Sequence, residues 1–477
     1  RPVGSLPAPK GIGSIGRMQG AEQRPAPPPA AAEAPAEMPA PTNPWWRRDP
    51  MLIVEVLLVA LLVVLARRLQ WIADDGYIYL THVQNWVSNG AGPNLNPGEP
   101  VEGFTSVAWL VVLALGDLVR PDRLLTLEQL TVLAGLVLTT VAAAMWIPVE
   151  RAAIRTTVGD PHDDDRDPAG RTDTPLVLNV PLILFATSYV VRSYATSGLE
   201  TSLVMLWATT VVWTVWTSRR SPVALALLAG LGPLVRPEFA LVSIGLVVLL
   251  VVEWRARPID DRFGGRSAIG LAAAVVVPGL VSEIVRVAYY GQLLPNTYYA
   301  KTGTSHGWSD GWTYLRDAAG PHRWWWMLAV SLAVAAAVPV WRLRRTGRFE
   351  LSAADRRRWT LLAFALLLAL ATMRSGGDFM HGRTLVPAFV MLLGSLSGAA
   401  SVGVRRLDRP QPSLRLAAVI GLALVLVVVQ LPITSRQHDT GRLIIGDIAD
   451  ELRFYEARDA NAHSFSGENL DRLAVMW

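Results

Sequence analysis

The sequence predicts an all-α membrane protein that crosses the bilayer many times. Of its 477 residues, 51% are hydrophobic, only 17% are charged and 18 are Trp. This composition departs from that of soluble domains towards that of integral membrane proteins. Apolar runs of spanning length also alternate with Arg-rich loops along the chain, as they do in multi-pass helical proteins.

Residues 1–49 are rich in Pro, Ala and Gly, and we expect a disordered cytoplasmic tail there because such a segment has little apolar surface to bury. A transmembrane domain is expected over residues 50–432, and the start of a periplasmic region over residues 433–477. No cleavable signal peptide is expected, because the first apolar run, which begins at Met51, is already as long as a spanning helix.

Eleven apolar runs are expected to span the membrane, or nearly so. They cover residues 51–72, 125–149, 175–191, 201–217, 222–237, 239–254, 267–288, 324–341, 358–373, 384–404 and 413–432. The run 106–119 is too short to span and favours an interfacial helix within a first periplasmic loop, residues 73–124. Leaving it out of the count places the main Arg-rich loops on the cytoplasmic side.

The chain has no Cys and a formal net charge of +5. The lack of Cys excludes disulfides, thiolate metal sites and cysteine nucleophiles. The Arg residues cluster in short loops between apolar runs, where membrane topology explains them better than nucleic-acid binding does. Walker, dinucleotide-binding and HExxH motifs are absent from the sequence.

The first apolar run is followed by an adjacent carboxylate pair, Asp74 and Asp75. Ionised groups at the end of a membrane helix must stay hydrated or find a partner. Two neighbouring acids also raise the pKa of one of them, which suits a general base. The structural alternative is that the pair caps the next helix, since Asp is a favoured N-cap residue. The two carboxylates could also share a divalent cation such as Mg²⁺, Mn²⁺ or Ca²⁺.

Four further polar breaks at helix ends fall on the same outer face as this pair. Their polar side chains are Glu200; Arg236 and Glu238; Asn296, Tyr298 and Lys301; and Asp378, His381 and Arg383. Their common side predicts one extracytoplasmic cavity. We expect Arg383, helped by His381, Arg236 and Lys301, to bind an anionic group, because guanidinium groups suit phosphate. The alternatives are a turn at residues 376–378, an internal Arg236–Glu238 ion pair, and a Glu200–Arg192 pair.

These segments resemble polyprenyl-phosphate-sugar-dependent glycosyltransferases of the GT-C fold, and among them the members that transfer arabinofuranose. The matching motifs are residues 74–77, 96–105, 197–201, 236–238, 294–301 and 377–383. The resemblance extends from about Met51 to Tyr455. Family members carry a sizeable periplasmic domain after the last helix, whereas only residues 433–477 follow here, which puts acceptor recognition by that domain in doubt.

The resemblance implies a bacterial plasma-membrane enzyme with its active site on the periplasmic face. It implies a decaprenyl-phosphoryl-arabinofuranose donor and a cell-wall arabinan acceptor, of arabinogalactan or lipoarabinomannan, that gains terminal β-(1→2) residues. Asp74 would be the base and Asp75 its partner, although a carboxylate nucleophile or a same-face mechanism fits net retention equally well. Substrate contacts are expected from Glu200, Glu238, Asn296, Tyr298, Asp378 and Glu102. The alternatives are a transferase for another polyprenyl-linked sugar, such as mannose, and a lipid-linked sugar transporter.

Overall fold

The computed structural model describes residues 51–120, 124–158, 178–217, 221–256, 264–296, 299, 307–399, 421–428, 430, 444–445, 448–449 and 451–452. The expected tail, residues 1–49, lies outside this part of the chain. Residues 45–477, to which every described element belongs, form one unit.

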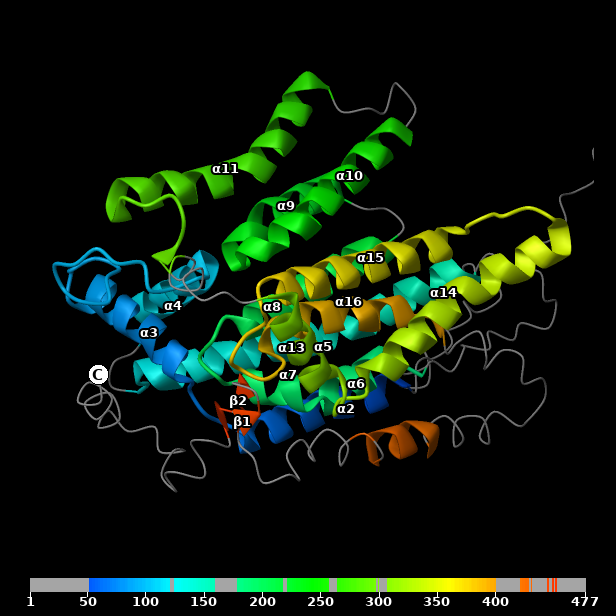
Figure 1. Cartoon of the computed structure of the whole chain (residues 1–477), viewed down its shortest axis with the longest axis horizontal. Helices are drawn as coiled ribbons and strands as arrows, with labels where there is room; N and C mark the ends of the chain where they lie inside the picture. Colours follow the sequence, from blue (N-terminus) through cyan, green and yellow to red (C-terminus); the bar gives the residue numbers. More distant parts are fainter. Residues whose placement is uncertain are drawn as a thin grey trace, which may run out of the picture. The chain divides into compact units, whose positions relative to one another are not determined.

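Helices make up nearly all of the described secondary structure (Figure 1). The elements are α2 (Met51–Arg68), α3 (Asp74–Val83), the π-helix η1 (Gln84–Ser88), α4 (Val107–Val119), α5 (Leu127–Val158), α6 (Val180–Thr187), α7 (Tyr189–Tyr194), α8 (Thr201–Trp216), α9 (Pro222–Val235), the 3₁₀-helix η2 (Pro237–Phe239), α10 (Ala240–Ala256), α11 (Gly265–Tyr290), α13 (Trp308–Ala319), α14 (Trp324–Thr346), α15 (Ala353–Arg374), the 3₁₀-helix η4 (Arg383–Leu385), α16 (Val386–Leu396), β1 (Ile444–Ile445) and β2 (Ile448–Ala449).

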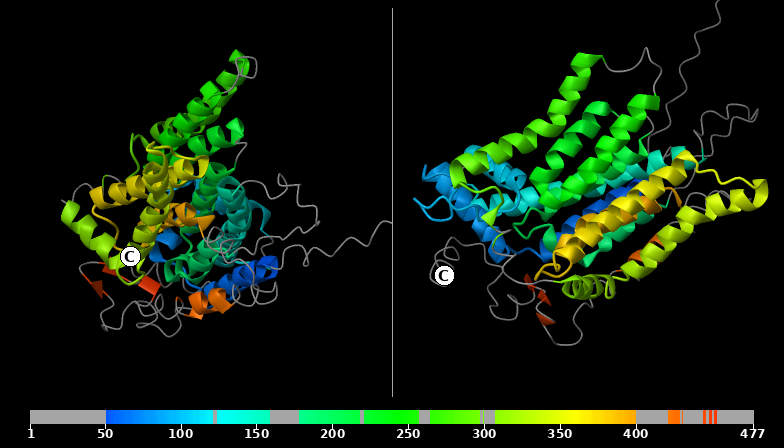
Figure 2. Two further views of the ribbon diagram at one scale, coloured as in Figure 1. Left: turned by 90° about the vertical axis from the view of Figure 1, so that its right-hand side faces the viewer. Right: turned by 45° about the horizontal axis from the view of Figure 1, so that its top comes forward.

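The core lies around α8 and α16. Every residue of α16 is buried, and α8 packs against both α5 and α16. Helices α9, α10 and α11 form a second group, in which α9 contacts the other two (Figures 1 and 2). Helix α11 has no buried residue in the described part of the chain, although it is strongly apolar. Such a helix is suited to a lipid environment rather than to water.

The membrane class is confirmed, and the number of spans stays a prediction. Within the described residues, four helical segments are long and apolar enough to cross a bilayer: Leu127–Thr157, Pro237–Ala256, Gly265–Tyr290 and Trp324–Thr346. The short run 106–119 forms the 13-residue helix α4, which at 1.5 Å per residue is ~20 Å long and falls short of the hydrocarbon core.

One expected span is interrupted. The run 175–191 forms α6 and α7, which are separated at Ser188, where the backbone is extended with φ −64° and ψ 126°. A pattern of apolar residues cannot reveal this break, because all the residues of α6 except Val180 and Leu184 are buried, and the side chains of α7 are buried as well.

A buried ion pair connects three of the helices. Glu55 of α2 is 1% exposed and binds Arg151 of α5 through Nη2 at 2.7 Å. The side-chain amide of Asn179, at the start of α6, donates to the same carboxylate at 2.8 Å. An acid in an apolar helix is therefore fully compensated by its neighbours, as a buried charge must be.

Candidate active site

The carboxylate pair forms the first turn of α3. This helix begins at Asp74, and its N-cap is Ala73, which supplies no side-chain cap. The N-cap alternative for the pair is therefore wrong, although negative charge in the first turn still favours the helix dipole. Asp74 Oδ1 accepts the backbone N–H of Asp75 at 2.7 Å. Burial raises the pKa of Asp75, an effect that the nearby guanidinium of Arg383 partly offsets.

A close backbone contact holds this turn against the loop that precedes α8. The N–H of Ala73 donates to the carbonyl of Ser197 at 2.9 Å. A Cβ on Gly76 would lie only 3.0 Å from that same carbonyl oxygen and 2.9 Å from Ile72. Glycine at position 76 therefore permits the approach that brings the pair towards Glu200.

Arg383 lies at the centre of the site. It follows Gly382, whose φ of 67° turns the chain into η4. Its Nη1 lies 3.1 Å from Asp75 Oδ2, and its Nη2 lies 3.2 Å from both carboxylate oxygens of Glu200. Asp378 Oδ2 is 3.7 Å from Nη1. Only 8% of the Arg383 side chain is exposed, so these contacts are largely shielded from water.

A second guanidinium, that of Arg236, extends the cluster. It lies at the break between α9 and η2, where Nη1 binds Glu200 and Nε binds Glu238, both at 2.5 Å. The internal Arg236–Glu238 ion pair, which was one of the alternatives considered from the sequence, is thus present. Burial of Glu200 is outweighed by the guanidinium groups of Arg383 and Arg236, which lower the pKa of this carboxyl to about 2. Glu200 is therefore ionised at any physiological pH.

The ion cluster, as we call it, consists of Asp75, Glu200, Arg236, Glu238, Asp378 and Arg383. Its four carboxylates outnumber its two guanidinium groups, so it carries an excess of negative charge when all are ionised. The Nε–H of Arg383 is buried and has no hydrogen-bond acceptor among the described residues. An unpaired buried donor is costly.

His381 turns towards a different set of side chains. Its Nδ1 contacts the carboxylate of Asp317, and its Nε2 lies 3.1 Å from Nε2 of His322. Both histidines are at most 3% exposed. This group could not be predicted from the sequence, because Asp317 and His322 belong to no motif.

The other expected site residues lie apart from the cluster or outside the described residues. Glu102 is buried and binds Arg286 of α11 at 2.8 Å. Asn296 is half-buried, and no hydrogen bond joins it to the cluster within the described part of the chain. Tyr298 and Lys301 lie outside the described residues.

A third carboxyl group reaches the pair from the far end of the chain. Glu451 Oε1 accepts the backbone N–H of Asp74 at 3.2 Å, across 377 positions of sequence. Burial, followed by a hydrogen bond with the Asp74 side chain and by the charge of that carboxylate, raises the pKa of Glu451 to about 10, so this side chain is neutral at pH 7. Sequence analysis missed it because a lone Glu in a polar segment carries no signal.

No group of three or more His, Asp or Glu side chains within the described residues is placed to hold a metal ion. Asp75 is bound to Arg383 instead, and Glu451 approaches Asp74 through the backbone. The donor set around the pair thus offers no fit to a divalent cation in this part of the chain.

The described residues thus form a helical membrane chain with a buried, acid-rich ion cluster at its helix ends, and comparison with known proteins indicates its relatives. The chain is related to glycosyltransferases, and specifically to arabinofuranosyltransferases. It is 31% identical over 357 residues to the terminal beta-(1->2)-arabinofuranosyltransferase of Corynebacterium glutamicum, covering 68% of this chain and 47% of that protein. The equally named protein of Mycobacterium tuberculosis is 30% identical over 435 residues, covering 83% of this chain and 64% of that protein.

The resemblance to arabinose-transferring enzymes is thereby confirmed. The chain spans about half to two thirds of the length of these relatives. No protein-family model and no solved structure matches it.

Proposed function

We propose that this protein transfers arabinofuranose from a decaprenyl-phosphate-linked donor to cell-wall arabinan, adding terminal β-(1→2) residues at the outer face of the plasma membrane. The observation that carries the proposal is the placement of the Asp74–Asp75 turn against the buried ion cluster, in a chain related to two arabinofuranosyltransferases. A lipid phosphate is already a leaving group, so the reaction needs no nucleotide site.

The two acids of the pair have environments that suit different roles. Asp75 is bound to Arg383, whereas no guanidinium is bonded to Asp74 among the described residues. We therefore assign the reacting role to Asp74, which no guanidinium in the described part of the chain neutralises and which lies beside the neutral carboxyl group of Glu451. With Asp74 as base, it takes the proton of the acceptor hydroxyl, the acceptor oxygen bonds to the anomeric carbon, and the bond from that carbon to the phosphate oxygen breaks; retention then requires attack on the face that the phosphate leaves. With Asp74 as nucleophile, its carboxylate first displaces the phosphate and the acceptor oxygen then displaces the carboxylate, so two inversions give retention.

The excess of carboxylates supports glycosyl transfer in particular. The transition state of such reactions resembles an oxocarbenium ion, with positive charge on the sugar ring. Fixed negative groups beside that ring stabilise the charge as it develops and need no rearrangement. Glu200, which is ionised and held by two guanidinium groups, is such a fixed group; Glu238 and Asp378 extend the same negative region.

Arg383 is our candidate for the donor phosphate, since its buried Nε–H lacks an acceptor in the described part of the chain. Arg236, His381 and Lys301 remain proposed helpers. Arg236 is bound to carboxylates, so it would act mainly through its charge, and His381 is bound to Asp317. Glu102, Asn296 and Tyr298 stay proposed substrate contacts.

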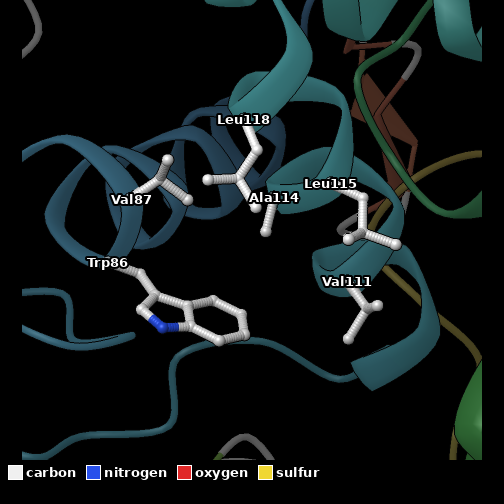
Figure 3. Close-up of a pocket in the computed structure, with 6 residues that line it drawn as sticks. All are labelled: Trp86, Val87, Val111, Ala114, Leu115 and Leu118. Carbon is white, nitrogen blue, oxygen red and sulfur yellow. The ribbon is translucent and has the colours of Figure 1, made fainter.

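The isoprenoid part of the donor requires apolar surface near the site. One such surface is a pocket of ≈ 270 Å³ between η1 and α4, lined by Trp86, Val87, Val111, Ala114, Leu115 and Leu118 (Figure 3). It lies at the opposite end of the α3–η1 helical segment from Asp74. Trp86 is 41% exposed there and Leu118 is 66% exposed.

The proposal is tested with purified full-length protein, radiolabelled decaprenyl-phosphoryl-arabinofuranose and a short arabinan acceptor. We expect labelled arabinan that a β-(1→2)-specific linkage analysis identifies. A parallel reaction with polyprenyl-phosphoryl-mannose should give no product. Transfer of mannose, or label that merely crosses the bilayer of a proteoliposome, would contradict the proposal.

A further inference from the structure

Residues 448, 449, 451 and 452, which we call the C-terminal segment, pack beside the loop that carries Arg383. The backbone N–H of Ala449 donates to the carbonyl of Phe379 at 2.7 Å, and the N–H of His381 donates to the carbonyl of Ala449 at 3.0 Å. These bonds form a parallel bridge between Met380 and Ala449. Met380 is fully buried, and Leu452 is 2% exposed. This segment is thus packed and hydrogen-bonded rather than loosely apposed.

Docking places Glu451 at the unprotected start of α3. The first N–H groups of a helix have no partner within the helix and are usually bound by the side chain of the N-cap residue. Ala73 occupies that position and has no such side chain. Glu451 Oε1 instead accepts the N–H of Asp74, the first residue of the helix, at 3.2 Å.

The other oxygen of this carboxyl group is uncommitted. Glu451 is 5% exposed, and its Oε2 is buried with no hydrogen-bond partner among the described residues. A buried polar group usually finds a partner. Asp74 lies beside this oxygen. A substrate hydroxyl group that approached Asp74 would also come close to it.

We propose that Glu451 is a positioning residue that caps α3 from the C-terminal segment and so holds Asp74 at the reacting centre. This inference rests on the proposed function, because it assumes that Asp74 acts on the substrate. It adds that residues 448, 449, 451 and 452 complete the site. Glu451 acts through the backbone and side chain of Asp74 and performs no bond-breaking step of its own.

The test compares Glu451→Ala with Glu451→Gln in the full chain. Gln keeps an oxygen that can accept the Asp74 N–H, whereas Ala removes the cap. We expect Glu451→Ala to lower kcat by about tenfold or more with the donor KM within about threefold of its original value, and we expect Gln to restore most of that loss. A purely structural role would not separate kcat from KM in this way.

Glu150 provides a matched control. It is also a buried carboxyl group with one oxygen bonded to a backbone N–H, that of Gly398 at 3.0 Å, and the other oxygen unpaired among the described residues. It lies fifteen positions beyond Gly135, the residue of α5 that packs against Ala195 near the site, a separation of ~22 Å along the helix. Glu150→Ala should lower thermal stability and leave kcat unchanged.

A second measurement tests docking without any substrate. The chain has no Cys, so the double variant Met380→Cys/Ala449→Cys contains only the two thiols that the bridge brings together. Paired strand positions are within disulfide range. We expect rapid oxidative cross-linking in membranes, whereas each single variant should form no intramolecular bond.

The outcomes separate the two proposals. Failure of the unaltered protein to transfer arabinose, with the cross-link formed, would overturn the proposed function and leave the docked segment in place. Absence of the cross-link, an unchanged kcat in Glu451→Ala, or equal losses in the Ala and Gln variants would overturn the role of Glu451.

Discussion

Asp74 and Asp75 are neighbours in sequence and differ in what holds them. Asp75 is bound to a buried guanidinium. Asp74 instead accepts the backbone N–H of Asp75 and lies beside the carboxyl group of Glu451. Substitution by Asn, which keeps the shape and removes the charge, should therefore affect the two positions differently.

Asp74→Asn should reduce transfer by roughly a hundredfold or more, because a base or nucleophile is lost. Its thermal stability should hardly change. Asp75→Asn should lower stability as well as activity, because it removes one partner of the buried Arg383. Thermal unfolding and initial rates of both purified variants check this, with exposed Glu99→Gln from the same loop as control. Full activity of Asp74→Asn would eliminate the central role of this residue.

The raised pKa of Glu451 predicts a pH dependence of stability. The folded protein keeps a proton on this carboxyl group up to a pH of about 10, whereas the unfolded chain releases it near the ordinary Glu pKa of ~4.3. The unfolded state is therefore favoured progressively as pH rises between these values, and the contribution of Glu451 to the free energy of unfolding falls.

Glu451→Gln removes this titration. The melting temperature of the variant, relative to that of the unaltered protein, should increase steadily between about pH 5 and pH 9. Thermal unfolding in detergent at a series of pH values measures it. A difference that does not vary with pH would show that Glu451 is ionised in the folded protein.

All six residues of the ion cluster were expected from the sequence, but few of their pairings were. Polar residues at helix ends of a membrane protein are rare enough to identify Glu200, Arg236, Glu238, Asp378 and Arg383 as a group. Which carboxylate binds which guanidinium depends on backbone approaches such as that of Gly76 to Ser197, and these have no sequence signature. Glu451 was missed for a related reason, since its role arises from a single long-range contact.

At the scale of elements, α3 does not continue as a uniform α-helix. Tyr79 and Val83 are buried, as their helical spacing predicts, but Trp86 in the π-helical turn η1 is 41% exposed. A π-turn holds more residues per turn than an α-helix, so the apolar face rotates at this point. The indole consequently lines the pocket of Figure 3 rather than the core.

Filling this pocket tests whether it binds the isoprenoid chain. Ala114→Phe should raise the KM for a decaprenyl donor severalfold. It should affect a donor with a short isoprenoid much less, because only the long chain would reach and bury the apolar surface of the pocket. Val119→Phe is the control, since Val119 lies on α4 outside the pocket lining and is 81% exposed. Equal effects on both donors would assign the pocket no part in lipid binding.

At the scale of the whole molecule, composition was enough to predict a helical membrane protein, but hydropathy does not show where tertiary contacts interrupt an apolar run or compensate a charge within it. Helix α2 contains a buried acid satisfied by Arg151 and Asn179. Helices α6 and α7 replace one expected span with two short segments. Contacts with neighbouring helices make a buried charge or a broken helix tolerable in a membrane protein. The sequence of a single apolar run does not show which residues of other helices it will contact.

The proposed topology is open to a direct labelling test. Ser375 and Arg348 are both exposed and flank α15, whose 22 residues separate them by ~33 Å. With the active site outside, Cys at Ser375 or Glu99 should react with an impermeant thiol reagent in intact cells, and Cys at Arg348 should react only after lysis. Labelling of position 348 in intact cells would reverse the orientation.

The distance in sequence between Asp74 and Glu451 has a consequence for biosynthesis. The two residues are 377 positions apart, so at translation rates of about 5–20 residues per second the acid pair is made roughly 20–75 s before its cap. During that interval the backbone N–H of Asp74 lacks the acceptor that Glu451 provides. The cap that we propose for Glu451 can therefore form only after residues 74 to 451 have been synthesised.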